Sequence, residues 1–193
     1  MEGALKVLFI GGTGTISSAC VDLAVARGID LTLLNRGNAT RPIPAGVPVL
    51  QGDIRDKAAT ARLLGDHTFD VVANFVAFTP EHIETDLELF RGRTKQYVFI
   101  SSASAYQTPP VNWPTTESTP LRNPFWAYSR AKIACEDRLT AAYREEGFPA
   151  TIVRPSHTYD ARSLPLRGRH TIFDRMRKGE IEGRVVLRMT DEP

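Results

Sequence analysis

The sequence has few cysteines, no long apolar run and little net charge, and each shortage excludes a class of protein. Its two cysteines, Cys20 and Cys135, are too few to stabilise a small secreted domain, and both fall in predicted helices, where we expect reduced core thiols. No apolar stretch approaches the length of a membrane span. A formal net charge of +2 is too small to indicate nucleic acid as a partner. We therefore expect a globular cytoplasmic protein without a membrane partner, and its net charge gives no indication of nucleic acid as a partner.

Metal-binding patterns and leader segments are not found either. His67, His82 and His170 lack the spacing of metal ligands, so no metal site is predicted. The first predicted strand begins within a few residues of Met1, so no targeting peptide is expected.

Length limits the number of domains. A chain of 193 residues can form one sizeable domain and is short for two. We predict a main domain over residues 1–160. Residues 161–193 hold eight Arg or Lys against five Asp or Glu. This segment is interpreted as a basic solvated tail or as the remnant of a region that binds an anionic substrate.

A glycine-rich turn between a strand and a helix is the most informative stretch. The apolar run Leu5–Ile10 predicts a buried parallel strand, and the apolar spacing from Ile16 to Ala24 predicts an amphipathic helix. Between them, bare N–H groups and the positive end of the helix dipole favour a pyrophosphate. Ser17 stands where a third glycine is usual, and we expect its side chain to hold the helix slightly away from the sheet. The predicted pyrophosphate site consists of Gly11, Gly12, Thr13, Gly14, Thr15 and Ile16.

The end of the second strand bears on the choice of dinucleotide. A strand predicted from Leu31 ends at Asn35 and Arg36, where a dinucleotide-binding fold contacts the adenosine ribose. A carboxylate at this position would bond the 2′-hydroxyl and repel a 2′-phosphate, whereas an arginine pairs with phosphate. The sequence therefore favours NADP over NAD as the cofactor.

Strands and helices alternate along the rest of the chain. This alternation predicts an α/β fold with a doubly wound parallel sheet. Asp56 is the expected N-cap of the first of the further helices. The predicted strands cover 47–51, 69–75, 96–101 and 150–154, and the predicted helices cover 57–64, 80–90, 125–146 and 171–178, with a short apolar run at 185–187.

Tyr128 and Lys132 are candidates for acid–base chemistry. They stand four residues apart in a predicted helix and therefore share one face. A tyrosine with a pKa near ~10 is a poor base at neutral pH, and a neighbouring ammonium group favours its phenolate. Ser101 and Ser102 end the preceding strand, where a hydroxyl can hold a substrate oxygen near the phenol.

Taken together, these motifs resemble the extended short-chain dehydrogenase/reductases, the NAD(P)-dependent epimerase/dehydratase family. The resemblance covers roughly residues 4–178 and implies a Rossmann fold, with an NAD(P)-binding domain over 1–160. The motifs that carry it occur in order: Gly11-Gly-Thr-Gly14, Asp53, Phe99-Ile-Ser-Ser-Ala-Ser-Ala-Tyr106, Tyr128-x-x-x-Lys132, and Arg154-Pro155 with Tyr159.

The resemblance implies a role for each matching residue. Tyr128 would be the catalytic acid/base, and Lys132 would hold the nicotinamide ribose and lower the pKa of Tyr128. Ser102 would bond the reacting oxygen, with Ser101 as the neighbouring possibility.

The same resemblance implies further contacts with the dinucleotide. Asp53 and Ile54 would flank the adenine. Pro155 and His157 would lie beside the nicotinamide, and for His157 a polar loop position without a catalytic task is an equal interpretation.

Two departures from the family pattern limit the expected activity. The fifth-strand motif lacks the Asp-Glu pair of the family's sugar-nucleotide dehydratases, which favours redox or epimerisation chemistry over dehydration. Family members also continue into a C-terminal substrate domain, most of which is absent from these 193 residues.

Two functions remain open on this basis. The first is an NAD(P)-dependent oxidoreductase or epimerase acting on a carbinol or ketone of a small, sugar-nucleotide-like substrate, which the intact Ser102, Tyr128 and Lys132 favour. The alternative is a non-catalytic dinucleotide-binding sensor or RNA-associated protein of the same fold, which the missing substrate domain favours.

The resemblance also implies a homodimer paired through the helices at 80–90 and 125–146. Apolar side chains of the second helix would supply the contact or would instead pack in the core. They are Phe125, Trp126, Ile133 and Leu139.

Overall fold

Six parallel strands form one sheet in the computed structural model, which describes residues 3–39 and 41–158. Their spatial order is β3-β2-β1-β4-β5-β6, so the chain starts in the middle of the sheet and winds outward in both directions. This arrangement confirms the predicted doubly wound α/β fold. The strands are β1 (Lys6–Ile10), β2 (Asp30–Asn35), β3 (Val49–Gln51), β4 (Phe69–Asn74), β5 (Thr94–Ile100) and β6 (Ala150–Val153).

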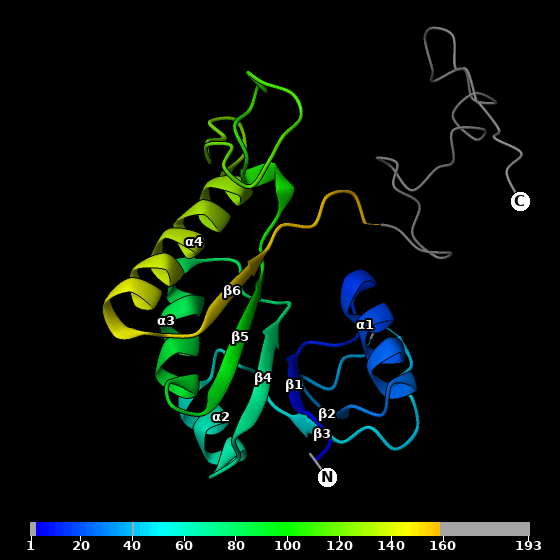
Figure 1. The fold of residues 1–193 in the computed structure, drawn as a ribbon. Coiled ribbons are helices and arrows are strands. Elements are labelled where there is room, and N and C mark those ends of the chain that lie inside the picture. Colours follow the sequence, from blue (N-terminus) through cyan, green and yellow to red (C-terminus); the bar gives the residue numbers. More distant parts are fainter. Residues whose placement is uncertain (1–2, 40, 159–193) are drawn as a thin grey trace, which may run out of the picture. The chain divides into compact units, whose positions relative to one another are not determined.

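Helices cover both faces of the sheet. Helix α1 (Thr15–Ala26) lies on one face, and α2 (Lys57–Leu64), α3 (Pro80–Phe90) and α4 (Ala127–Glu146) lie on the other (Figure 1). Asp56 caps α2 as predicted, because its carboxylate accepts a hydrogen bond from the Ala59 N–H at 3.0 Å.

Two apolar clusters, one on each face, form the core. Alternate residues of β1 point to opposite faces, so Val7 packs with Val21 of α1 while Leu8 packs with residues of α3 and α4. Leu139 of α4 is fully buried in the second cluster. The core interpretation of Leu139 is therefore the correct one, and this side chain is not available for a dimer contact.

The chain divides into two compact units, residues 1–156 and 157–193. Only residues 157 and 158 of the second unit are among the described residues. Four features predicted from the sequence lie outside the described residues: Tyr159, the basic segment 161–193, the helix at 171–178 and the apolar run at 185–187.

Among the described residues, no helix is long and apolar enough to cross a membrane. Within the same ranges Cys20 and Cys135 are free thiols on α1 and α4.

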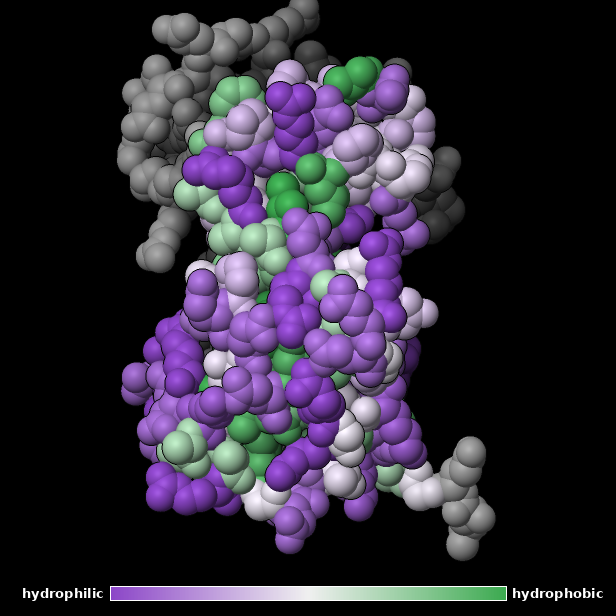
Figure 2. Space-filling view, turned by 90° about the vertical axis from the view of Figure 1, so that its left-hand side faces the viewer, coloured by the Kyte–Doolittle hydropathy of each residue, from purple (hydrophilic) through white to green (hydrophobic). Residues whose placement is uncertain are grey.

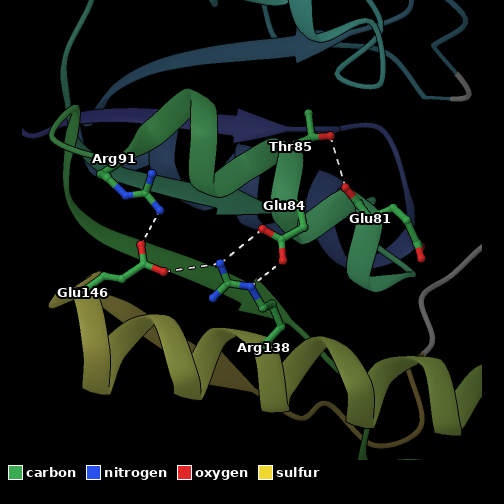
Figure 3. A network of polar contacts seen from close by, with 6 residues as sticks. All are labelled: Glu81, Glu84, Thr85, Arg91, Arg138 and Glu146. Atoms are coloured by element: carbon green, nitrogen blue, oxygen red, sulfur yellow. Dashed lines mark hydrogen bonds and ion pairs between the residues drawn. The ribbon is translucent and has the colours of Figure 1, made fainter.

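Ion pairs join α3 and α4 at the surface (Figure 3). Arg138 contacts Glu84 and Glu146, and Glu146 also contacts Arg91 at the end of α3. Hydrophilic side chains dominate the face shown in Figure 2, with smaller apolar areas between them. Because water screens the exposed ion pairs between α3 and α4, these pairs contribute little to stability but make the surface formed by the two helices charged.

A polar triad is buried between the sheet and α3. Tyr97 of β5 and Asn74 of β4 both donate to the same oxygen of Asp86, Asn74 from 2.6 Å. The other Asp86 oxygen has no hydrogen-bond partner among the described residues. Burial raises the pKa of Asp86 from 3.8 to about 7, although the hydrogen bonds from Tyr97 and Asn74 act in the opposite direction.

The buried carboxyl of Asp86 should make stability depend on pH. In the unfolded chain Asp86 ionises near 3.8, whereas in the folded chain it keeps its proton up to about 7. The folded state therefore binds more protons than the unfolded state between these values, and the stability contributed by the neutral carboxyl is lost as pH rises from about 4 to 7. Asp86→Asn removes this titration. As pH rises from about 4 to 7, the free energy of unfolding of the variant minus that of the parent should therefore increase by about 2–4 kcal/mol.

Urea denaturation at several pH values between 4 and 7 measures this difference. Asp137→Asn, the same change at an exposed position of α4, is the control and should follow the parent. A stability difference between Asp86→Asn and the parent that stays constant with pH would contradict the assignment.

Candidate cofactor and catalytic site

A cavity of about 150 Å³ lies at the carboxyl ends of the strands in the middle of the sheet. In the strand order found here, the winding direction reverses between β1 and β4, which is where open α/β sheets bind ligands. We call this space the glycine-turn cavity. Six residues predicted to bind a cofactor line it: Gly11, Thr13, Asn35, Arg36, Asp53 and Ile54.

The turn after β1 requires glycine at two successive positions. Gly11 and Gly12 have φ values of +103° and +124°, which side chains rarely adopt. A Cβ on Gly12 would also lie 3.0 Å from two methyl carbons of Leu33, and one on Gly11 would lie 3.3 Å from Val76 Cγ1. Gly12 is buried beneath the turn, whereas Gly11 lines the cavity, so the bare backbone forms part of its wall.

Ser17 bonds the glycine turn, a role that the sequence expectation did not include. Its side chain is only 2% exposed, and its hydroxyl oxygen accepts a hydrogen bond from the Gly14 N–H at 2.9 Å. The hydroxyl therefore ties the glycine turn to the first turn of α1. The N–H groups of Thr15 and Ile16 lie in that first turn, where a helix offers no backbone acceptor, so they fit an anionic oxygen.

Arg41 adds a positive charge beside the start of α1. Its guanidinium donates to the hydroxyls of Ser18 at 2.8 Å and Thr15 at 3.2 Å. Sequence reasoning missed this residue, because it lies in a proline-rich loop whose path has no periodic signal.

The end of β2 carries a buried donor without a partner. Asn35 accepts a hydrogen bond from the Gly37 N–H through Oδ1 at 2.9 Å, while its Nδ2 is buried and unpaired within the described residues. Arg36 follows it in the same cavity wall. An unpaired amide donor beside a guanidinium and a bare glycine turn fits the ribose and phosphate oxygens of a dinucleotide.

A second group of predicted residues meets where β5 ends. Ser102 follows β5 and begins the short 3₁₀ turn η1 (Ala103–Ala105), and its side chain hydrogen-bonds with Tyr128 of α4. Lys132 of the same helix donates to the carbonyl of Ile100, the last residue of β5. Pro155, just after β6, accepts a hydrogen bond from the Ala103 N–H at 2.9 Å, which brings the end of β6 beside the same turn.

Lys132 does not act on Tyr128 in the way the sequence suggested. Its ammonium is almost fully buried and donates to the carbonyls of Ala77 and Ile100, each at 2.7 Å. Burial raises the pKa of Tyr128, and a hydrogen bond with the Ser102 side chain lowers it by less. Because the expected lowering of the Tyr128 pKa does not occur, the phenol keeps its proton at neutral pH. Burial also lowers the pKa of Lys132, to about 8.

Phe78 connects the two groups of residues. It lines the glycine-turn cavity, and its ring centroid lies 4.8 Å from the Lys132 ammonium and 6.4 Å from the ring of Tyr128. The cofactor residues and the catalytic candidates are therefore adjacent. Phe78 follows β4 in a segment without a recognisable motif, and for this reason sequence reasoning missed it.

His157 belongs to the second unit and is exposed. Its predicted place beside the nicotinamide stays a prediction.

The whole arrangement agrees with a match to a known protein family. The sequence profile of the NAD dependent epimerase/dehydratase family matches residues 7–188. The chain belongs to this family.

The sequence is similar to curated relatives whose names give different activities. It is 30% identical over 169 residues to the UDP-glucose 4-epimerase of Lactobacillus helveticus, covering 78% of this chain and 51% of that protein. It is 26% identical to the 2'-dehydrokanamycin reductase of Streptomyces kanamyceticus, covering 82% of this chain and 44% of that protein. The chain thus spans about half the length of the curated relatives that it matches.

Solved structures of the family share the fold. The UDP-glucose 4-epimerase of Thermus thermophilus, in complex with NAD, superposes with a TM-score of 0.68 at 24% identity, over 84% of this chain and 58% of that one. The dTDP-glucose 4,6-dehydratase of Bacillus anthracis, also with NAD, superposes with a TM-score of 0.67 at 20% identity, over 78% and 54%.

An ion pair between Arg154 and the buried Glu136 lies behind the catalytic candidates. Glu136 of α4 is buried and accepts hydrogen bonds from Arg154 at 2.6 Å and from the Ser101 hydroxyl. Arg154 also donates to the Tyr106 hydroxyl at 3.1 Å. These bonds join α4 to the ends of β5 and β6. Sequence reasoning missed Glu136, although its position four residues after Lys132 on the same helical face is a signal that could have found it.

Proposed function

We propose that the chain is an NAD(P)-dependent oxidoreductase or epimerase that acts on a carbinol or ketone of a sugar nucleotide. The observation that carries the proposal is the meeting of Ser102, Tyr128 and Lys132. The Ser102 side chain hydrogen-bonds with Tyr128, and the Lys132 ammonium lies 5.7 Å from the Tyr128 ring and 4.8 Å from the ring of Phe78, which lines the glycine-turn cavity. The curated relatives named UDP-glucose 4-epimerase support a sugar nucleotide as the substrate class. The whole activity is a proposal because the chain spans only about half of these relatives.

The residues of this chain would divide the work on the substrate oxygen. A bound dinucleotide would supply hydride transfer at the carbon atom. Tyr128, protonated at neutral pH, would give its phenolic proton to the oxygen of a ketone and take it back in the reverse direction. Ser102 would donate a hydrogen bond to the same oxygen. Lys132 would keep a positive charge behind the phenol and hold the segments that end at Ala77 and Ile100.

Replacing the phenol tests the proposed chemistry. Tyr128→Phe should lower the rate of hydride transfer with UDP-sugars or simple ketones by about 10²–10⁴-fold, because the proton donor is lost, while dinucleotide binding persists. Tyr143→Phe, at an exposed position of the same helix, is the matched control and should keep the rate of the parent. Turnover that survives in Tyr128→Phe would refute the role of this residue.

A non-catalytic dinucleotide-binding protein, a sensor or an RNA-associated protein, is the second candidate. The observation that favours it is the position of Lys132, whose ammonium is buried against two backbone carbonyls. In that case calorimetry should detect dinucleotide binding, while the parent turns over none of the UDP-sugars or ketones.

For the cofactor we propose a preference for NADP over NAD. The solved relatives of Bacillus anthracis and Thermus thermophilus hold NAD, so the argument depends on Arg36 in this chain. NADPH should bind at least about tenfold more tightly than NADH, because the guanidinium can pair with the 2′-phosphate. Arg36→Asp should abolish or reverse the preference.

Fluorescence titration with both dinucleotides measures the preference. Arg27→Asp makes the same charge change at the opposite end of α1, away from the cavity, and should leave the preference as it is in the parent. Equal affinities of the parent for NADPH and NADH would remove the argument.

We also propose a homodimer formed through α3 and α4. The centre of this face carries the ion pairs of Figure 3, and Leu139 is in the core. Phe125 and Trp126, which are 74% and 54% exposed at the start of α4, are the exposed apolar candidates, whereas Ile133 is half-buried. Light scattering should give a dimer at micromolar concentration, and Phe125→Ser with Trp126→Ser should shift it toward monomer. Trp113→Ser, at another exposed aromatic position, is the control, and a monomeric parent would refute the dimer.

A further inference from the structure

Three serine hydroxyls form a continuous hydrogen-bonded chain beside Tyr128. Ser129, fully buried on α4, donates to the hydroxyl oxygen of Ser104 at 2.8 Å. The Ser104 and Ser102 hydroxyl oxygens lie 2.8 Å apart. The chain therefore begins next to Tyr128 in sequence, crosses to the turn η1, and ends at the hydroxyl assigned to the substrate oxygen.

The number of hydrogens in the chain decides its direction. The Ser104 oxygen already accepts from Ser129, so its own hydrogen is available for Ser102. If Ser102 donated to Ser104 instead, the Ser104 oxygen would receive two hydrogens and its own would have no acceptor among its bonds in the described residues. The direction from Ser129 through Ser104 to Ser102 uses every hydrogen.

This direction leaves Ser102 with one remaining function. Its oxygen receives the Ser104 hydroxyl and also the Ser104 backbone N–H at 3.2 Å, which together occupy its two lone pairs. Only the hydroxyl hydrogen of Ser102 is then left to interact with a ligand. A donor is the group required to polarise a carbonyl oxygen or to stabilise negative charge on it.

We propose that Ser104 is a positioning residue that turns the Ser102 hydroxyl hydrogen toward the substrate oxygen, with Ser129 fixing the hydroxyl of Ser104. The proposal rests on the proposed function of this site, because it assigns the direction of one of its hydrogen bonds. In the free protein a hydrogen bond with the Ser102 side chain lowers the pKa of Tyr128, as a Ser102 hydroxyl that donates to the phenol oxygen would.

Asn123 strengthens the connection between the two elements involved. Its side-chain amide donates to the Ser104 carbonyl at 2.9 Å, and its Oδ1 accepts from the N–H groups of Phe125 and Trp126 at 3.1 Å each. The turn that carries Ser102 is therefore tied to the start of the helix that carries Tyr128. With the backbone held in this way, the loss of one hydroxyl should change the direction of a hydrogen bond more than it changes the fold.

The pKa of Tyr128 reports on the Ser102 hydrogen without requiring turnover. A hydroxyl that donates to the phenol oxygen stabilises the phenolate and so lowers the Tyr128 pKa. The other titratable groups that act on Tyr128 are the Lys132 ammonium, 5.7 Å from its ring, and the Cys135 thiol on the same helix. Substitution of Ser104 changes neither of them.

Ser104→Ala and Ser104→Thr are the matched pair of variants. Alanine removes the relay, so the Tyr128 pKa should rise and kcat should fall about tenfold while dinucleotide affinity stays as in the parent. Threonine keeps the hydroxyl and should restore both. The pKa is measured by NMR of ¹³C-labelled tyrosine, with the Tyr128 signal assigned from Tyr128→Phe.

Ser129→Ala breaks the relay at its other end and should raise the Tyr128 pKa to a smaller extent, so it serves as a second test if Ser104→Ala does not fold. The proposal is overturned if the Tyr128 pKa in Ser104→Ala equals that of the parent. If only Ser129→Ala folds, the same comparison is made with that variant. If the parent shows no turnover, the proposed function fails, whereas the pKa comparison still decides whether the relay orients Ser102.

Discussion

The buried ammonium of Lys132 holds the site together. Burying an ammonium group is costly unless hydrogen bonds and cation–π contacts with aromatic rings replace its hydration. Here two carbonyls accept from it, and the rings of Phe78 and Phe99 lie 4.8 and 4.7 Å from it. Ala77 follows β4 and Ile100 ends β5, so one charge on α4 joins the ends of two neighbouring strands. The catalytic candidates all lie on α4 or directly after β5.

The partners of Lys132 are themselves held by buried polar contacts. Asn74 accepts a hydrogen bond from the Val76 N–H at 2.7 Å, which fixes the turn that leads to Ala77. The Asn74 side chain in turn donates to a carboxyl oxygen of Asp86. On the other side, Glu136 holds Ser101 next to Ile100. A cleft built from parallel strand ends has no backbone ladder to stiffen it beyond the last residue of each strand. Side-chain bonds of this kind therefore decide where Ser102 and Phe78 stand.

The fold was predictable from the sequence because its signals are local. Alternating apolar runs and amphipathic stretches predicted helices at 57–64 and 80–90 with the bounds that the structure has. The glycine turn, the end of β2 and Asp53 were likewise recognisable, and they line one cavity. By contrast, the contacts of Arg41, Phe78 and Ser104 join segments distant in sequence. No periodicity carries such information, since it depends on which loops the folded sheet brings together.

Ser17 and Lys132 show why a motif predicts a fold more securely than it predicts chemistry. Ser17 departs from the glycine pattern, yet its hydroxyl bonds the Gly14 N–H and keeps the turn closed. Lys132 matches its pattern, yet its ammonium binds backbone carbonyls and the pKa of Tyr128 rises with burial. A backbone turn tolerates any side chain that satisfies its hydrogen bonds, whereas proton transfer depends on where a single charge lies. The direction of the Tyr128 pKa follows from the burial of its phenol, which the presence of Lys132 four residues later in the sequence did not reveal.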